Sequence, residues 1–302
     1  MVARLYNSKL PPILYHYTDL NGLMGIIKDK CLWATDIHYL NDFSEMSYAF
    51  DFISERIKSF METIPSEDRD RLGLRTSLDD ERRTEYEFFE DLEKVITGIK
   101  RLPKDYTSFI CSFSKNDDRL SQWRGYSPGE GGYCIAFDRK RLIELSKDNK
   151  FSICECLYKP DRNQKKLVDK IITEEIHKHF DESSKKCGDN SVIIEAMIKF
   201  YFIAPRLKDP AFHEEEEWRF FKQSTKPLNF NIDNIKYRKG SKVLIPYTEF
   251  KLAEEIKDLP IQSIKVGPMP HQELAKRSLE NYLNHEGVKC DITCSPIPYR
   301  IL

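Results

Sequence analysis

A ten-residue segment in the second half of the chain combines acidic and aromatic side chains in an arrangement that suits chemistry. Residues 212–221 read FHEEEEWRFF. In an extended strand alternate side chains share a face, so from position 215 onward we expect Glu215, Glu217 and Arg219 on one face and mostly apolar side chains on the other. Two carboxylates about 7 Å apart along a strand can perturb each other. One carboxylate can then hold a sugar hydroxyl while the other activates a nucleophile. The alternative is a solvated acidic surface, which blocks of like charge commonly form.

The composition is that of an ordinary globular protein, and we expect one domain over residues 1–302. The hydrophobic content is 40% and the net charge is -1, so bulk charge does not favour nucleic acid, although a local basic groove is compatible with it. We expect no membrane segment, because no apolar run approaches the roughly 18 residues that a spanning helix needs. The chain does not open on a signal peptide, and several of its eight cysteines lie within apolar runs. These features favour a cytoplasmic protein with reduced thiols.

Hydrophobic periodicity predicts an α+β fold with a mixed sheet, since strands and helices follow no regular βαβ rhythm. The expected strands cover residues 13–18, 31–35, 107–114, 133–137, 151–158, 212–221, 243–245, 261–267 and 289–295. The expected helices cover 22–28, 139–146, 163–180, 191–203, 253–257 and 270–286, together with a charged helical insertion at about 46–100. The last strand–helix–strand unit could pair in parallel.

Several common cofactor signatures are absent. The glycine-rich turn at 128–132 precedes a strand rather than a helix, so it is not a dinucleotide phosphate fingerprint. A phosphate-binding P-loop, an HExxH zinc motif and a GxSxG nucleophile motif do not occur. The cysteine pairs 154/156 and 290/294 lack partners at a familiar zinc spacing, and we expect no metal site.

Four short motifs occur in a specific order. They are YHYT at 15–18, NDxxE at 41–45, WxxY at 123–126 ahead of an apolar strand, and ExEWR at 215–219. As an ordered set they resemble a bacterial and phage family of unknown function that looks like a divergent branch of the ADP-ribosyltransferase superfamily. The resemblance extends from Leu14 to the strand at 261–267.

This resemblance implies a split, mixed β-sheet of ADP-ribosyltransferase type with flanking helices, which grips NAD in a cleft between its two halves. His16, with Thr18 beside it, would hold a ribose and orient the nicotinamide end. Glu217 would bind the nicotinamide ribose, and Glu215 would complete the two-glutamate motif of some branches. Breaking the nicotinamide–ribose bond passes through an oxocarbenium-like state that carboxylates stabilise.

The aromatic residue that stacks on nicotinamide is less sharply defined. Trp33 occupies the position where better-known branches often carry a tyrosine, and Tyr39, Trp123 and Tyr126 are alternatives. The two WxxY aromatics could instead be core residues.

The remaining polar residues of the motifs have two interpretations each. Asn41 belongs to the expected NAD site, and the Asn41-Asp42 pair is also typical of a turn. Asp42 and Glu45 have the spacing of a helix-capping box. Arg219 or Arg124 could take the pyrophosphate, but Arg219 could also pair with a glutamate of its own strand.

We therefore predict an NAD-dependent ADP-ribosyltransferase that serves as a toxin or anti-phage effector. Nucleic acid is favoured over protein as acceptor, with RNA ahead of DNA, because basic and aromatic residues mix at 119–126 and 235–239. A toxin would imply an antitoxin protein as partner. A protein-modifying transferase, an NAD glycohydrolase, and a non-catalytic module that binds a nucleotide or a partner are the alternatives.

Overall fold

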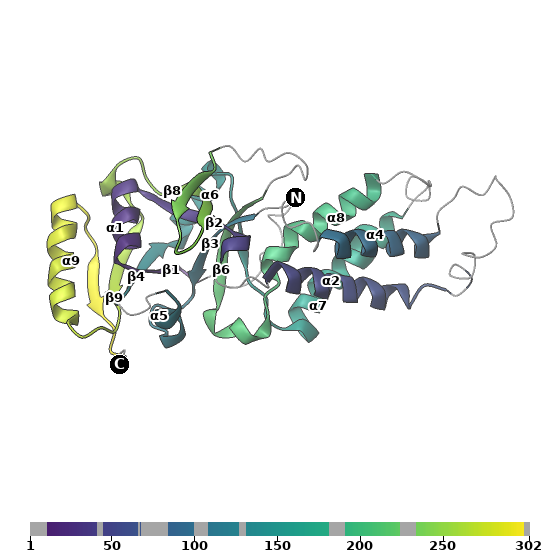
Figure 1. Cartoon of the computed structure of the whole chain (residues 1–302), viewed down its shortest axis with the longest axis horizontal. Coiled ribbons are helices and arrows are strands. Elements are labelled where there is room, and N and C mark those ends of the chain that lie inside the picture. The colour runs from purple at the N-terminus through teal and green to yellow at the C-terminus, as the bar shows by residue number, and fades with distance from the viewer. Residues whose placement is uncertain are drawn as a thin grey trace.

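The computed structural model describes residues 11–40, 45–65, 67, 84–99, 108–126, 131–180, 191–223 and 234–298. The molecule is elongated, with a β-sheet and its covering helices at one end and a group of helices at the other (Figure 1). Within the described ranges, every helix is too short or too polar to cross a membrane. Seven cysteines lie in these ranges, and all are free thiols.

The sheet is mixed, which confirms the α+β class. Its strands are β1 (Ile13–Thr18), β2 (Cys31–Asp36), β3 (Ser108–Ser114), β4 (Tyr133–Asp138), β5 (Ser152–Glu155), β6 (Glu217–Gln223), β7 (Lys236–Lys239), β8 (Leu244–Lys251), β9 (Ile261–Val266) and β10 (Asp291–Cys294). The main order is β10-β9-β4-β1-β3-β2-β8-β7, and β6 pairs with both β3 and β5. The parallel pairing expected at the end of the chain is confirmed for β9 and β10, which helix α9 (Gln272–Glu286) connects.

The sheet divides along one edge of β3. The opposite edge of β3 pairs with β6 over its whole length. On the divided edge, β1 meets β3 only at Ser114, whereas β2 meets it only at Phe109 and Ile110. Residues 111–113 therefore have no strand partner on that side, and β1 and β2 diverge from this gap. The His16 ring reaches into the gap, where its Nδ1 lies 2.9 Å from the carbonyl oxygen of Ser112.

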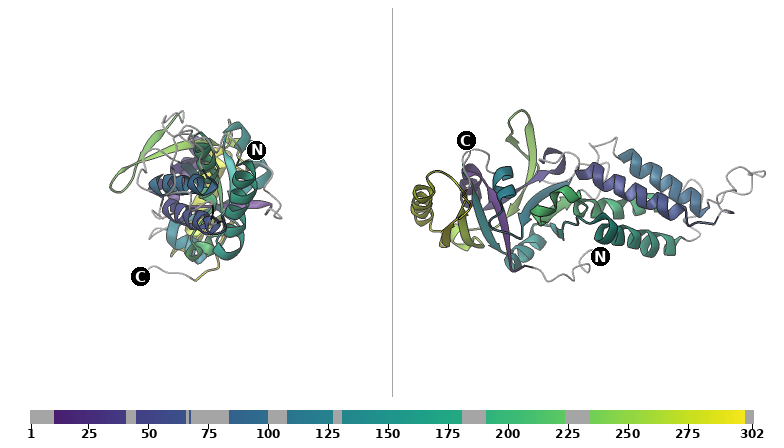
Figure 2. Two further views of the ribbon diagram at one scale, coloured as in Figure 1. Left: turned by 90° about the vertical axis from the view of Figure 1, so that its right-hand side faces the viewer. Right: turned by 90° about the horizontal axis from the view of Figure 1, so that it is seen from below.

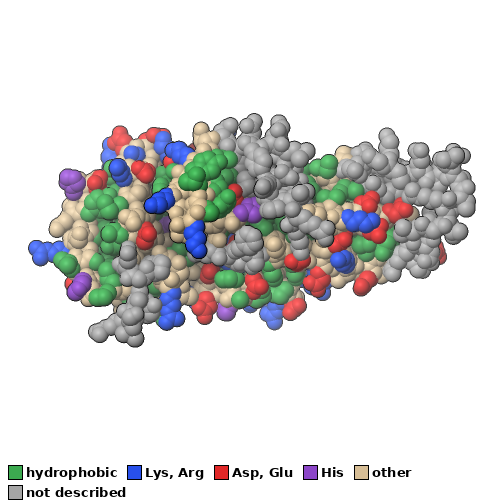
Figure 3. Space-filling model, viewed as in Figure 1, with side chains coloured by type: hydrophobic (Ala, Val, Ile, Leu, Met, Phe, Trp, Pro, Cys, Tyr) green, Lys and Arg blue, Asp and Glu red, His purple; other side chains and the backbone are tan. Residues whose placement is uncertain are grey.

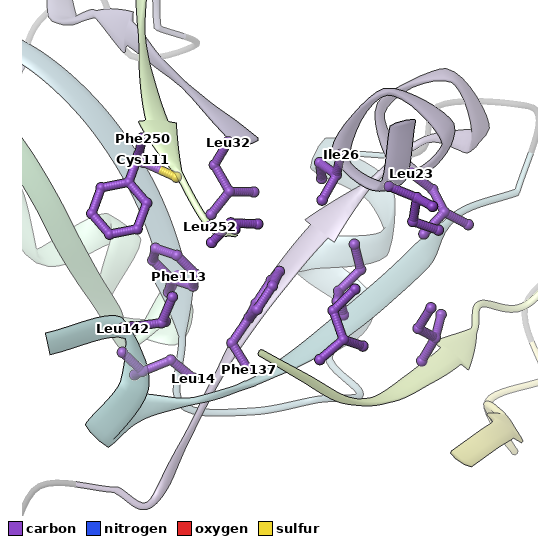
Figure 4. Close-up of a cluster of buried hydrophobic side chains, with 14 of the residues drawn as sticks. Leu14, Leu23, Ile26, Leu32, Cys111, Phe113, Phe137, Leu142, Phe250 and Leu252 are labelled. Atoms are coloured by element: carbon purple, nitrogen blue, oxygen red, sulfur yellow. The ribbon is translucent and has the colours of Figure 1, made fainter. Parts of the chain in front are cut away.

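The sheet lobe has its own hydrophobic core, part of which is shown in Figure 4. Leu14 of β1, Phe113 of β3 and Phe137 of β4 lie at its centre. Helix α1 (Leu20–Asp29) adds Leu23 and Ile26, and α6 (Arg139–Asp148) and α9 cover other parts of the sheet. Helix α1 begins at Leu20, two residues before the predicted start, because the Asp19 carboxylate caps it by accepting a hydrogen bond from the Gly22 amide.

The helical lobe is assembled from two separate stretches of chain. Helices α2 (Glu45–Met61) and α4 (Glu85–Ile99) form the predicted insertion, and they pack on α7 (Lys165–Lys170) and α8 (Ser191–Ile203) (Figure 2). Short π-helical turns flank α7 at Pro160–Gln164 and Ile171–Ile176. The lobe encloses a second core of buried apolar side chains, which include Ile53, Phe88, Phe89, Ile172 and Phe200. The insertion is thus half of a larger helical unit.

The strand predicted over 212–221 is wrong in its first part. Residues Pro210–Glu215 form a 3-10 helix, because Pro210 suits the first helical turn and Asp209 accepts a hydrogen bond from the Ala211 amide. Glu216 then adopts a left-handed conformation with a φ of 42°, so β6 begins only at Glu217. Glu215 is therefore not on the strand. Glu217 and Arg219 do share a strand face, as expected.

Smaller differences affect three other elements. The strand predicted at 243–245 is the start of the longer strand β8, which forms an antiparallel hairpin with β7. The helix predicted at 253–257 is a single 3-10 turn, Ile256–Asp258. The WxxY motif lies on a short helix, α5 (Leu120–Tyr126).

Candidate functional site

A cleft of about 1030 Å³ opens where the sheet divides. Strands β1, β2, β3 and β6 and the 3-10 helix before β6 contribute most of its walls. Eight of the residues that the sequence singled out line it: His16, Thr18, Trp33, Tyr39, Tyr126, Glu215, Glu217 and Arg219. Trp123 does not line the cleft, and Asn41 lies outside the described residues.

Lys208 lies at the centre of a buried charge cluster in one wall of the cleft. Its ammonium nitrogen is 2.5 Å from the Glu215 carboxylate, 2.7 Å from that of Glu217 and 3.2 Å from that of Glu45. The side chain of Lys208 is only 4% exposed, so these contacts replace its water shell. Two carboxylates near the start of β6 and a third from the distant helix α2 thus share one cation.

Arg219 is the second cation of this cluster and is almost completely buried, with 1% of its side chain exposed. Its Nε donates to Glu217 at 2.8 Å, its Nη1 donates to the Pro205 carbonyl at 3.1 Å, and its Nη2 lies 2.7 Å from Glu45. Every nitrogen of the guanidinium is occupied, so a phosphate would have to displace a protein partner. Of the two interpretations of Arg219, this geometry favours pairing within the protein.

The two glutamates of the ExEWR motif differ in their electrostatics. Burial alone would raise the pKa of Glu217, but the charges of Arg219 and Lys208 outweigh it and hold that pKa well below the ordinary value. Burial raises the pKa of Glu215, which has Lys208 as a cationic contact and Glu217 as a repelling neighbour. Glu217 is therefore a fixed negative charge, whereas Glu215 is the carboxylate better suited to exchange a proton.

His16 faces the cleft as a neutral imidazole. A carbonyl oxygen can only accept, so Nδ1 must carry the proton in the contact with Ser112, and Nε2 is left as an acceptor. Burial lowers the pKa of His16, with the hydrogen bond to Ser112 acting against it. The ring is also held by Phe113, with centroids 5.6 Å apart. An acceptor nitrogen in this setting can take a hydrogen bond from a sugar hydroxyl.

The candidate aromatic residues fall into two groups. Trp33 and Tyr39 line the cleft and are 41% and 42% exposed, so a planar group can reach them. Tyr126 also lines the cleft, and burial raises its pKa. Trp123, by contrast, is buried with its ring edge-on to Tyr17. This geometry agrees with the interpretation of Trp123 as a core residue.

Two members of the charge cluster have only weak signals in the sequence. Glu45 was expected either in a capping box or in the site, and its carboxylate meets Arg219 and Lys208. Lys208 follows no motif. It is brought to the cluster by the contact between its backbone amide and the Leu157 carbonyl, at 3.1 Å, beside the parallel bridge of Leu157 with Leu207.

Comparison with known proteins gives one family. A profile described as "Protein of unknown function (DUF2971)" matches residues 122–220, about a third of the chain. This stretch contains the WxxY motif, Lys208 and the ExEWR motif, but neither His16 nor Trp33. No curated protein and no solved structure matches the chain.

Proposed function

We propose that the chain is an NAD-dependent ADP-ribosyltransferase. The observation that carries this proposal is the position of the cleft. It opens at the division of a mixed sheet, and it brings together an acceptor histidine from β1, exposed aromatic rings and the glutamates beside β6. The resemblance of the motif set implies this arrangement for NAD.

The proposed reaction uses the two glutamates differently. Glu217 is the fixed negative charge that favours the oxocarbenium-like ribose as the bond from its C1′ to the nicotinamide nitrogen breaks. Nicotinamide leaves with the electron pair of that bond. Glu215 accepts the proton from the attacking hydroxyl or amine of the acceptor, whose oxygen or nitrogen forms the new bond to C1′.

His16 and the aromatic residues hold the substrate in this scheme. The Nε2 of His16 accepts a hydrogen bond from a ribose hydroxyl, while Ser112 keeps the ring oriented. Trp33 is the aromatic face for the planar leaving group, since its ring is exposed on the cleft wall. Arg219 and Lys208 keep the glutamates in place.

Nucleic acid is the acceptor class that we favour, with RNA ahead of DNA. The β7–β8 hairpin stands out from the sheet (Figure 2) and carries both basic and apolar side chains (Figure 3). Two of its residues, Arg238 and Lys239, line the cleft. Tyr237 on this hairpin is 64% exposed, and it is flanked by Lys236, Arg238 and Lys239. An exposed ring among cations suits stacking on an unpaired base. A role as toxin or defence effector with a protein antitoxin is part of the same proposal.

The test is incubation with NAD labelled in its adenylate phosphate, in the presence of separate pools of RNA, DNA and protein. We expect label on the RNA pool, and we expect Glu217→Gln and Glu215→Gln to abolish it. Glu216→Gln is the matched control, because Glu216 lies between these residues but pairs with Arg119 on the surface, at 2.5 Å, outside the cleft lining.

The other outcomes identify the competing functions. Label on protein alone would show that the acceptor is protein rather than nucleic acid. Nicotinamide release without label on any pool would identify an NAD glycohydrolase. If NAD is not consumed with any pool, the enzymatic proposal is wrong and a binding module becomes the better explanation.

A further inference from the structure

Arg238 on β7 is a cation in the cleft wall whose hydrogen-bonding capacity is largely unused. Its Nη2 donates one long hydrogen bond, 3.3 Å, to the Thr35 hydroxyl. Its Nε is buried without a hydrogen-bond partner in the described part of the chain. The guanidinium carbon lies 5.7 Å from the centre of the Trp33 ring. None of the ion pairs formed among the described residues includes Arg238.

A half-buried guanidinium with spare donors is costly unless an acceptor joins it. Burial lowers the pKa of Arg238, and the neighbouring Tyr247 and Asp19 offset this only in part. The residue therefore lacks the compensation that Arg219 receives from Glu45 and Glu217. The planar fork of donors on an arginine matches the oxygen spacing of a phosphate.

The distribution of charge along the cleft also favours an anion beside Arg238. Lys208 and Arg219 are held by three glutamates, and a phosphate placed there would meet like charge. Arg238 and the adjacent Lys239 reach the cleft from β7, on the far side of β2, and neither forms an ion pair with a described residue. Asp19, which also lines the cleft, is a more distant charge neighbour of Arg238. The cleft is thus acidic beside β6 and basic beside β7.

We propose that Arg238 is the phosphate-binding residue of the cleft and holds the diphosphate of a dinucleotide whose ribosyl end points toward Glu215 and Glu217. The identity of the dinucleotide as NAD rests on the proposed function, whereas the binding of a diphosphate at Arg238 does not. The assignment moves the role expected of Arg219 to a residue outside the four motifs. It also orients the ligand, since its phosphates and its reacting ribose lie at opposite ends of the cleft.

Trp33 provides a direct measurement of binding. It is the exposed tryptophan of the three, since Trp123 and Trp218 are both buried. A ligand at Arg238 should therefore change the fluorescence of Trp33. Titrations with inorganic diphosphate, NAD, adenosine and a single-stranded oligonucleotide would be made on the full chain. The variants are Arg238→Gln and, as the control, Lys251→Gln. Lys251 lies on β8 outside the cleft lining, and its exposed side chain pairs with Glu254.

We expect diphosphate and NAD to bind the unmodified chain and Lys251→Gln with equal affinity. Arg238→Gln should weaken both at least tenfold and leave adenosine unchanged, because adenosine carries no phosphate. The thermal midpoint of Arg238→Gln should equal or exceed that of the unmodified chain, since the buried Nε loses no protein partner. A fall in the midpoint would reveal a structural role and overturn the assignment.

Failure of this inference can be told apart from failure of the proposed function. If diphosphate binds through Arg238 but NAD is never consumed, the inference stands and the transferase proposal falls. If Arg238→Gln binds and consumes NAD like the unmodified chain, the inference falls and the transferase stands. Absence of diphosphate and NAD binding to the unmodified chain would overturn the inference, as would an effect on the oligonucleotide alone.

Discussion

Replacing Lys208 by methionine tests whether the buried charge cluster stabilises the protein. Methionine has nearly the same length and volume but no charge. The change leaves Glu45 and Glu217 with Arg219 alone and removes the ion pair of Glu215 with Lys208. Lys208, Glu45 and Glu217 have side chains only 4% to 5% exposed, so water does not screen the loss. Removing one partner of such a buried pair costs about 3–5 kcal/mol. A domain is stable by only about 5–15 kcal/mol, so the loss should be plainly visible.

The assay is urea denaturation of the full chain at pH 7, followed by tryptophan fluorescence. We expect the free energy of unfolding to fall by about 3–5 kcal/mol in Lys208→Met. Lys236→Met is the control, because the side chains of Lys236 and Glu249 are 50% and 36% exposed, and an exposed pair is worth at most about 1 kcal/mol. The double variant Lys208→Met with Glu215→Gln should recover part of the loss, because it removes the carboxylate that pairs with Lys208 but not with Arg219.

A loss of less than about 1 kcal/mol in Lys208→Met would refute this reasoning, since an exposed pair is worth as much. It would mean that the three carboxylates relax toward water or bind protons when the cation is removed. A double variant that is less stable than both single variants would contradict the assignment in a second way, because it would show that the Glu215 side chain contributes through contacts other than Lys208.

Two further predictions concern the β1 wall of the cleft. A Cβ at Gly22 would lie 1.9 Å from the Thr18 hydroxyl, so Gly22→Ala should displace Thr18, destabilise the fold by about 1–3 kcal/mol and weaken NAD binding in titration. Gly98→Ala is the control, because nothing lies within 4 Å of its Cβ position, and it should be neutral or stabilising. Equal effects of the two substitutions would contradict this prediction. The lowered pKa of His16 means that the unfolded chain binds the proton more tightly than the folded chain. This residue's contribution to stability should therefore be present above pH 6.5 and be lost as the pH falls below it, by at most about 1.4 kcal/mol per pH unit. In denaturation curves at several pH values that slope should be absent from His16→Asn, whose amide can still donate to Ser112, and an unchanged slope would show that another group causes it.

Local patterns in the sequence predict most of the strands and helices. The strand at 13–18 and the helix at 191–203 appear at the expected residues, because each follows from side-chain periodicity and flanking residues alone. The segment 212–215 is the instructive exception. Its acidic residues read as a continuation of β6, but Pro210, the Asp209 cap and the left-handed Glu216 turn it into a 3-10 helix. Turn chemistry upstream of a strand outweighs the strand pattern here.

The membership of the site is predicted in part. His16 is recognisable from the YHYT motif, and Trp33 from the position at which related branches often carry a tyrosine, and both do line the cleft. Lys208 and Arg238 are not recognisable, since a lone lysine or arginine in a polar stretch resembles any surface cation. Their importance comes from what surrounds them after folding.

The sequence by itself determines the α+β class, most element positions and the set of chemically capable side chains, because these depend on neighbours within a few residues. The tertiary structure alone decides that the sheet divides along β3 and that Glu45 meets Arg219 from 174 residues away. It also decides which cations are neutralised and which remain available. Charge pairing and burial depend on contacts between distant segments, and no local pattern encodes those contacts.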